Sequence, residues 1–425
     1  MIGMPAGMGE RVRSAGLSTA KKAAGLLTGM LPIPQPVLLV GPGASARLGE
    51  ALAGFGHRKL LIVTDRVVSG LGLTRPLVQA LARGGAKHVV FDAITADAPL
   101  PLIEQGIAFY RRHGCDAIVA FGGGSPMDAA KAIALAVANG KPPRQLVGYF
   151  RGLRAPVPLY AVPTTAGTGS EVTVAAVVTD PEAGRKLVIA DTRLVPLMAA
   201  LDPLLMTGLP RPVTAATGMD ALTHAVEAFV GDWATPHTDR MALAAVGIIY
   251  RSLRRAWRDG SDVAAREQMA LAATYAGLAF TRANVGYVHA LAHQLGGRYH
   301  VPHGLANAIL LPHVLRFLAP SATPRLALLA RQAGLAKPRA RPAALAAAFV
   351  ASVDALNRDL GLPTHVEALQ EADIPALAQA ACREADFNYP VPRYMTPANA
   401  EAILRAVLPP PAPAPRRRAR KTRSR

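Results

Sequence analysis

Short apolar runs alternate with helical segments over the first half of the chain. The apolar runs lie at 37–41, 59–65, 88–91, 117–121 and 159–162. The helical patterns between them lie at 74–83, 100–113 and 126–139. The runs are apolar at consecutive positions rather than at every second one, which is typical of strands buried on both faces. This alternation predicts a parallel sheet covered by helices.

Residues 174–190 depart from this pattern, because the turn at 180–184 separates two short strand-like segments and predicts a hairpin. Beyond about residue 209 the strand pattern ends. Ala- and Leu-rich helical segments follow at 212–231, 237–258, 262–280, 284–296, 303–318, 323–333, 341–360 and 374–384. We therefore expect an N-terminal α/β Rossmann-like domain with a parallel sheet over 32–208. An all-α C-terminal domain over 209–408 follows, and the cleft between the two is a common place for a cofactor and substrate.

The chain carries a formal net charge of +19, which suggests an anionic partner. Much of the excess lies at the ends: seven positive charges fall within 416–425, and four basic residues against one acid fall within the first thirty. We expect a basic extension over 1–31 and a disordered Pro/Arg-rich tail over 409–425, with no specific nucleic-acid site. Binding of nucleic acid or an anionic surface through these ends is the non-enzymatic alternative. Residues 15–31 predict a surface helix that packs on the protein or weakly contacts a membrane surface.

The small number of cysteines excludes two further classes of protein. The chain has two cysteines, Cys115 and Cys382, too few for a disulfide framework or a Cys-type zinc site. No apolar stretch approaches the about 18 to 20 uninterrupted residues of a membrane helix. These features predict a soluble protein of the reducing cytoplasm.

Residues 117–131 (AIVAFGGGSPMDAAK) follow the order strand, glycine turn, helix. Gly122, Gly123 and Gly124 allow a ligand to approach the backbone, and Ser125 suits the N-cap of the helix that follows. The free N–H groups of such a helix start can hold a pyrophosphate. Asp128 follows in the first turn and joins the candidate cofactor contacts. The alternative is an ordinary tight turn between a strand and a helix.

A second Gly-rich turn at 162–171 (VPTTAGTGSE) follows the strand at 159–162. Thr164, Thr165 and Thr168 offer hydroxyls to a phosphate or a ribose. Asp65 ends the second strand, where an acid can accept from ribose hydroxyls and disfavours a 2′-phosphate, so NAD is favoured over NADP. A helix-capping role is the alternative for Asp65.

Histidines concentrate near the middle of the helical half, since five of eleven fall between 289 and 313. His289 and His293 are four residues apart, as are Asp220 and His224, so each pair shares one face of a helix. With His303 after a helix break, these residues can enclose a divalent metal. Imidazole and carboxylate ligands suit Fe²⁺ or Zn²⁺ more than Ca²⁺. The alternative is a set of core or surface histidines without a ligand.

With these motifs the chain resembles the iron-containing (group III) alcohol dehydrogenase family, from about residue 34 to residue 408. The resemblance rests on GGGSPMDAAK (122–131), PTTAGTGSEVT (163–173), ATGMDALTHAVEAF (216–229) and VGYVHALAHQLGGRYHVPHGLANAILLPH (285–313). The family binds its metal through one Asp and three His, which fall here on Asp220, His224, His289 and His303. His293 matches a residue that the family keeps beside the metal and substrate, which implies a catalytic role in proton relay or hydrogen bonding.

The resemblance also implies NAD(H) as cofactor. The family's cofactor contacts fall on Asp65, Gly123, Gly124, Ser125, Thr164, Thr165, Thr168 and Lys186. Many members carry Pro-Asn-Pro or Pro-Asp-Pro where this chain has Ala96-Asp97-Ala98, so the polar contact is kept as Asp97 without its rigid flanks. The implied activity is a reversible alcohol dehydrogenase or aldehyde reductase. Its Fe²⁺, or Zn²⁺, acts as a Lewis acid in the cleft while hydride passes to the nicotinamide.

Several alternatives remain open within this interpretation. Lactaldehyde, glycerol, hydroxyacid–oxoacid and maleylacetate activities are known in the family, and apolar helices around the metal favour a small primary alcohol or aldehyde. A lyase of the dehydroquinate-synthase type has a similar domain pair but needs a more basic pocket, and Arg298 is the one basic residue of 284–313. Family members commonly form homodimers, which we also expect here.

Overall fold

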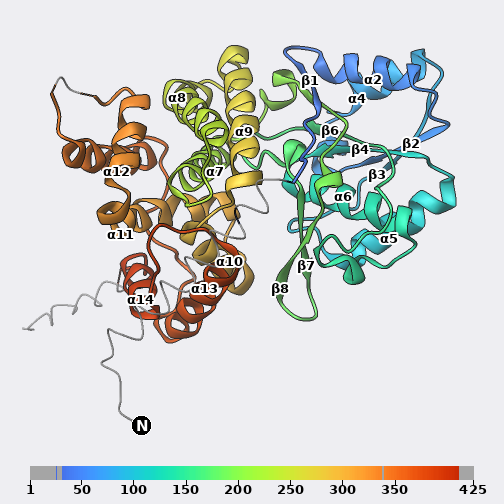
Figure 1. Ribbon diagram of the computed structural model, residues 1–425. Coiled ribbons are helices and arrows are strands. Elements are labelled where there is room, and N and C mark those ends of the chain that lie inside the picture. The colour runs from blue at the N-terminus through green and yellow to red at the C-terminus, as the bar shows by residue number, and fades with distance from the viewer. Residues whose placement is uncertain (1–24, 26–30, 337–338, 411–425) are drawn as a thin grey trace, which may run out of the picture.

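A computed structural model describes residue 25 and residues 31–336 and 339–410. The expected helix over 15–31 lies outside the described residues except for Gly25 and Leu31, and so does the basic tail beyond residue 410. Within the described part a sheet domain and a helical domain lie side by side, with α9 of the helical domain nearest the sheet domain (Figure 1).

Six parallel strands form the main sheet in the order β1-β9-β6-β4-β2-β3. Their bounds are β1 Val37–Val40, β2 Lys59–Val63, β3 Lys87–Phe91, β4 Ala117–Gly122, β6 Leu159–Pro163 and β9 Met198–Leu201. Every residue of β4 and β6 is buried, as the consecutive apolar runs predict. β9, at Met198–Leu201, was not expected from the sequence.

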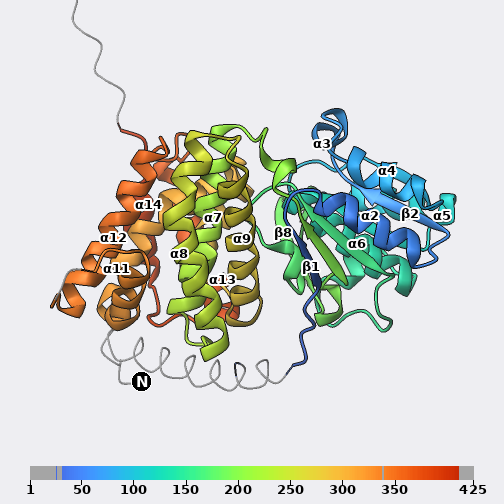
Figure 2. The ribbon, with the colours of Figure 1, turned by 90° about the horizontal axis from the view of Figure 1, so that it is seen from above.

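Helices cover both faces of this sheet (Figure 2). They are α2 Ala44–Gly54, α3 Arg66–Gly70, α4 Arg75–Arg83, α5 Leu100–His113 and α6 Gly124–Asn139, with the 3₁₀ turn η1 at Pro143–Leu146. Leu61 and Val63 of β2 pack with α5 and α6, whereas Leu60 and Ile62 pack with α2 and α4. The expected helices at 74–83, 100–113 and 126–139 are confirmed within two residues.

A small second sheet carries the predicted hairpin. Its order is β5-β8-β7, with β5 Gly148–Tyr149, β7 Ala175–Asp180 and β8 Arg185–Ala190. β7 and β8 are antiparallel, and Asp180 pairs with Arg185 beside the turn. The hairpin projects from the sheet domain alongside the helical domain (Figure 1).

The second half of the described chain is helical, as the Ala- and Leu-rich pattern predicts. Its helices are α7 Arg211–Val230, α8 Pro236–Arg258, α9 Val263–Ala283, α10 Tyr287–Tyr299, α11 His303–Gln332, α12 Pro342–Asp359, α13 Ile374–Asn388 and α14 Pro397–Ala406. The two helices expected at 303–318 and 323–333 are wrong, because α11 runs through without a break. Pro320 and Pro324 lie inside it, so packing of its buried apolar residues outweighs the backbone bonds that proline removes.

Among the described helices, α11 alone is long and apolar enough to cross a bilayer, and 61% of its most apolar stretch is buried inside the protein. That burial is typical of a core helix. The fold class is thus confirmed as a parallel α/β domain followed by an all-α domain. The boundaries at residues 32, 208 and 408 stay a prediction.

Candidate metal and cofactor site

Three helices of the helical domain bring four potential metal ligands together. α7 supplies Asp220 and His224, α10 supplies His289, and α11 supplies His303. One ligand atom from each of the four lies within 4.8 Å of the others. The side chains of the first three are almost fully buried, and that of His303 is 30% exposed. The cluster is therefore open to the outside through His303.

A close approach of α11 to α7 completes this cluster. At Gly304, next to His303, a methyl group would lie 2.4 Å from the carbonyl oxygen of Ala216 and 3.3 Å from Cβ of Asp220. Only glycine fits there without a shift of the backbone. The contact places His303 Nε2 3.6 Å from Asp220 Oδ1, across 83 residues of sequence.

Glu227 supports the cluster from behind. Its Oε2 accepts from His289 Nδ1 at 2.6 Å, and its carboxylate also accepts from the N–H groups of Gly286 and Val288. Burial raises the pKa of Glu227 to about 7. A carboxylate behind an imidazole is the usual outer partner of a metal-binding histidine, because it fixes the ring and its tautomer.

Sequence reasoning missed Glu227, although a signal was present. It lies seven residues after Asp220 and three after His224, so all three share one face of α7. A carboxylate at that spacing on a helix with two candidate ligands is a candidate outer partner.

The lowered pKa values of two histidines in the cluster favour binding of a cation. Burial, with His224 and His293 as neighbours, lowers the pKa of His289 well below 6.5. Burial likewise lowers the pKa of His303, with Lys186 among the other causes. Two neutral imidazoles and a carboxylate thus offer lone pairs to one point. Among the described residues few buried polar atoms lack a partner, and His224 Nδ1 is one of them. This donor set fits Fe²⁺ or Zn²⁺.

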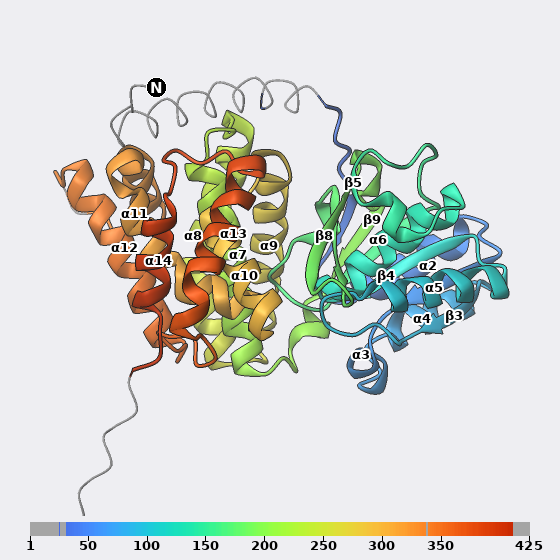
Figure 3. The same cartoon turned by 90° about the horizontal axis from the view of Figure 1, so that it is seen from below.

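His293 lies beside the cluster rather than in it. Its ring stacks on that of His303, with centroids 5.4 Å apart. Its Nδ1 donates to Glu384 Oε1 at 2.6 Å, and Tyr389 and Gln294 also donate to that carboxylate. Burial alone would raise the pKa of Glu384, but His293 and these hydrogen bonds lower it overall. Glu384 belongs to α13, which packs against α10 (Figure 3).

The predicted cofactor residues gather at the carboxyl ends of the central strands. Asp65 follows β2, the residues Gly123 and Gly124 follow β4, and the threonine-rich loop follows β6. A methyl group at Gly123 would lie 3.3 Å from Thr165 Oγ1, and one at Gly124 would lie 2.9 Å from Thr168 Cγ2. The two Gly-rich turns therefore face each other across the edge where such sheets bind dinucleotides. Thr164 is buried beside them, and its N–H donates to Gly122 O at 3.0 Å.

Two of these residues have roles in the protein itself. Asp65 caps α3 by accepting from the Val68 N–H at 2.9 Å, as the alternative interpretation allows. Ser125 is not the N-cap of α6, which is Gly123, so that expectation is wrong. The Ser125 hydroxyl instead accepts from the Asp97 N–H at 3.0 Å. Contacts of both side chains with a cofactor stay a prediction.

The turn at Asp97 differs from the family pattern in its backbone. Asp97 and Ala98 have φ of 63° and 45°, and proline, with φ near −65°, cannot replace Ala98 in this conformation. The Asp97 carboxylate accepts from Lys186 Nζ at 2.8 Å, so the turn is held by the hairpin. A methyl group at Gly296 of α10 would lie 3.8 Å from Lys186 Nζ. Lys186 therefore lies between the cofactor turns and the helix that carries His289 and His293.

Asp128 takes part in a separate buried network. Its two oxygens accept from Ser170 Oγ at 2.8 Å and from the Val177 N–H at 3.0 Å. Lys131 Nζ, one turn later, donates to Thr173 and to the Ala175 carbonyl. These contacts attach the threonine-rich loop to α6, and a cofactor contact for Asp128 stays a prediction.

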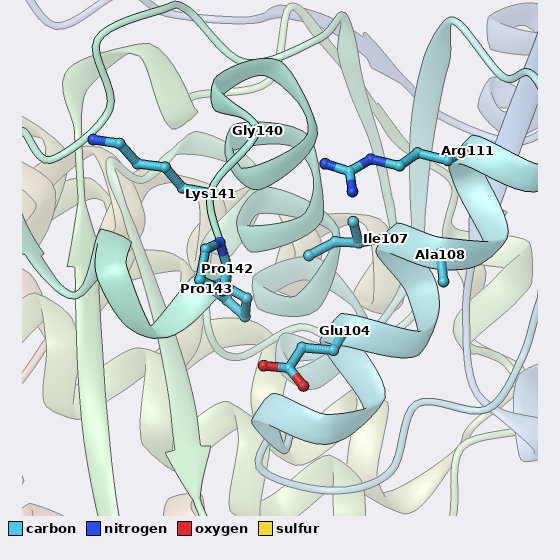
Figure 4. A pocket seen from close by; sticks show the side chains of 8 residues that line it. All are labelled: Glu104, Ile107, Ala108, Arg111, Gly140, Lys141, Pro142 and Pro143. Atoms are coloured by element: carbon cyan, nitrogen blue, oxygen red, sulfur yellow. The ribbon is translucent and has the colours of Figure 1, made fainter.

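A surface hollow of about 310 Å³ lies elsewhere on the sheet domain. Figure 4 shows the side chains that line it. It is lined by Glu104, Ile107, Ala108, Arg111, Gly140, Lys141, Pro142 and Pro143. These residues come from α5, the connection after α6 and the start of η1, and none belongs to the metal cluster or the cofactor turns. The hollow has no part in the chemistry described here.

Comparison with known proteins agrees with this geometry. The chain matches sequence models described as iron-containing alcohol dehydrogenase over residues 35–203 and as the Fe-containing alcohol dehydrogenase family, C-terminal, over 214–408. It is 41% identical over 355 residues to the 1,3-propanediol dehydrogenase of Klebsiella pneumoniae, covering 82% of this chain and 92% of that protein. It is 37% identical over 348 residues to the NAD-dependent methanol dehydrogenase of Bacillus methanolicus, covering 81% and 91%.

The crystal structure of a 1,3-propanediol oxidoreductase matches the fold with a TM-score of 0.86 at 39% identity, covering 89% of this chain and all of that one. The matched families are dehydrogenases, which favours an oxidoreductase over the lyase alternative. Arg298, the basic residue of the metal-site segment, is paired with Asp373 at 3.2 Å. The chain belongs to the iron-containing alcohol dehydrogenase family, and it is an NAD(H)-linked, metal-dependent oxidoreductase acting on CH–OH groups.

Proposed function

We propose that the chain interconverts a small primary alcohol and its aldehyde at the junction of its two domains. The observation that carries this proposal is the convergence of Asp220, His224, His289 and His303 within 4.8 Å. A divalent metal held by these residues supplies Lewis-acid polarisation of the substrate oxygen. The dinucleotide is held by the turns after β2, β4 and β6, with NAD preferred because Asp65 lies in the turn after β2.

Residues of the chain orient the reactants. Glu384 holds Nδ1 of His293. The other ring nitrogen, Nε2, is then the one that hydrogen-bonds a substrate or cofactor hydroxyl, takes up the proton of that hydroxyl and passes it on to solvent. Lys186, paired with Asp97, presents a cation between the two binding regions. Glu227 keeps His289 in one tautomer. These roles are part of the proposal.

Two observations support an aliphatic substrate. Phe280 stacks on His224 with ring centroids 4.2 Å apart, which gives the cluster an apolar wall. By their names, the relatives act on 1,3-propanediol and on methanol, both small primary alcohols. Lactaldehyde, glycerol, hydroxyacid and maleylacetate substrates are the competing members of the same family and enter the test below.

We also propose a homodimer and a cytoplasmic location. β1 is an edge strand of the main sheet, and the apolar side chains of Val37, Val40 and Leu197 beside it are exposed. An exposed apolar edge favours pairing with another chain. The two cysteines of the chain, Cys115 and Cys382, are both buried and too few for a disulfide framework, which agrees with a reducing compartment. Analytical ultracentrifugation tests the dimer, and a monomer at micromolar concentration would contradict it.

Anaerobic reconstitution tests the function. The metal-free chain is loaded separately with Fe²⁺, Zn²⁺ and Mn²⁺, and reduction of NAD⁺ or NADP⁺ is followed with alcohols of rising chain length and with the competing substrates. We expect turnover only with metal, faster with NAD⁺, and best with a short primary alcohol. Full activity of the metal-free chain would sink the proposal.

A further inference from the structure

Asn307 is a buried amide inside the metal cluster whose role nothing above explains. It lies on α11 one turn after His303 and is fully buried. Its Nδ2 is 2.7 Å from Asp220 Oδ1, and 3.2 Å from both His289 Nε2 and His303 Nε2. Three of the four candidate ligands therefore contact one amide nitrogen.

The hydrogen bonds of Asn307 show that its amide acts as a donor toward the candidate ligands. An amide nitrogen has two N–H groups, so one holds Asp220 and the other is shared by the two imidazoles. His289 can accept at Nε2, because its Nδ1 proton is donated to Glu227. The amide oxygen of Asn307 has no partner among the described residues. The side chain is thus oriented by the ligands alone, at the cost of an unpaired buried oxygen.

We infer that Asn307 is a positioning residue of the metal centre, an inference that rests on the proposed metal site. Its N–H group holds Oδ1 of Asp220, which leaves the second carboxylate oxygen as the free ligand atom. Its other N–H satisfies the lone pairs of His289 and His303 while no metal is bound, so the ligands stay assembled. Without it, buried lone pairs face one another unpaired, and the ligands spread apart.

A matched control exists on the neighbouring helix α12. Asn357 of α12 is also buried, its Nδ2 donates to the Ala308 carbonyl at 2.7 Å, and its Oδ1 also lacks a partner among the described residues. It contacts no candidate ligand. Leucine is similar in size to asparagine, so either substitution removes one buried amide group and leaves the space filled.

The test measures metal affinity in the full chain without substrate. Metal-free wild type, N307L and N357L are titrated with Zn²⁺ against a competing chromophoric chelator. The Co²⁺ forms are compared by their visible absorption. We expect N307L to bind Zn²⁺ about 10- to 100-fold more weakly than wild type, the range typical of outer-shell substitutions. N357L should bind within about threefold of wild type, with an unchanged Co²⁺ spectrum.

Equal affinities of N307L and wild type, or equal losses in N307L and N357L, would overturn the inference while leaving the metal site standing. Failure of the wild type to bind Zn²⁺ or Co²⁺ at all would instead overturn the proposed metal site, and the inference with it. If N307L does not fold, N307A is measured against N357A with the same expected difference.

Discussion

Two buried polar clusters, one in each domain, differ in how their groups are satisfied. In the sheet domain, Lys131 donates to three oxygens at 2.9 Å, and Asp128 accepts from two donors. Glu171 nearby accepts from Thr274 of α9 at 2.7 Å. In the helical domain, Asp220 and three imidazoles face one another, and His224 and Asn307 keep polar atoms without a partner among the described residues.

The contrast separates a structural network from a binding site. The cluster around Lys131 contains both signs of charge and satisfies its ammonium group, so it stabilises one arrangement of the loop between the domains. The cluster around Asp220 consists of a carboxylate and three imidazoles, and no Lys or Arg of the described residues forms an ion pair with Asp220. A positive ion bound among these ligands would take up their lone pairs. Of these two clusters, the one with unpartnered polar atoms is the one that holds the candidate metal ligands.

Removing a ligand should give the largest effect. H224A should abolish metal binding and lower turnover at least about 1,000-fold, because Lewis-acid polarisation is worth several kcal/mol. Metal content and the rate of NAD⁺ reduction measure it. His313 lies on α11 outside the cluster, so H313A should keep both metal and activity. Normal turnover of H224A would remove the metal from the mechanism.

Loss of the outer carboxylate should come next. E227A should weaken metal binding about 10- to 100-fold, because His289 loses the acceptor that fixes its ring. E227Q keeps an oxygen for one of the donors and should lose less. Zinc titration of the metal-free chain checks the order. An unchanged affinity in E227A would make Glu227 a structural residue only.

Loss of the His293 partner should affect turnover but not metal. E384A should lower kcat about 10-fold, since His293 is freed to rotate and no longer presents Nε2 consistently. Y389F should have a smaller effect, because it leaves the His293–Glu384 bond in place. Steady-state kinetics, together with the metal content of each variant, separates an effect on turnover from an effect on metal binding. A fall in metal content in E384A would contradict a role confined to His293.

Breaking the network of the sheet domain should have no effect on metal affinity. K131M should lower the free energy of unfolding by about 3 kcal/mol, because Asp128 and Glu171 lose the cation buried near them. Chemical denaturation and zinc titration of the same variant test both statements. A changed zinc affinity would mean that the two clusters are coupled.

Lys131 also gives the wild type a pH-dependent free energy of unfolding, whose sign follows from the direction of its pKa shift. Burial lowers the pKa of Lys131 from 10.5 to about 8, so between these values the unfolded chain binds more protons than the folded one. The free energy of unfolding of the wild type should rise across this range through this group. K131M should lack that part of the rise, and denaturation at pH 8 and at pH 10.5 would reveal it.

Much of the fold was predictable from local pattern. Consecutive apolar runs identified the strands that lie in the middle of the sheet, and the turn at 180–184 identified the hairpin. The misses are short or small-residue elements such as β9 and α2, and the continuous helix α11, where tertiary packing outweighs Pro320 and Pro324. Local signals of this kind cannot report how much burial compensates a lost hydrogen bond.

The metal ligands were also accessible from spacing, because Asp220 and His224, like His289 and its neighbour four residues on, are set by helical periodicity. Glu227 shares that helical spacing, but two other partners were not accessible in this way. Glu384 lies 91 residues from His293, and Asn307 lies 87 from Asp220. No local periodicity links positions so far apart.

The sequence by itself determined the order of the two domains, the ligand types and the family. Only the tertiary structure decided that Ser125 meets Asp97 instead of capping its own helix, and that Lys186 bridges to the helical domain. It also decided which histidine is backed by Glu227 and which by Glu384. The physical reason is that side-chain periodicity is encoded locally, whereas hydrogen-bond partners depend on distances that exist only after distant helices have packed.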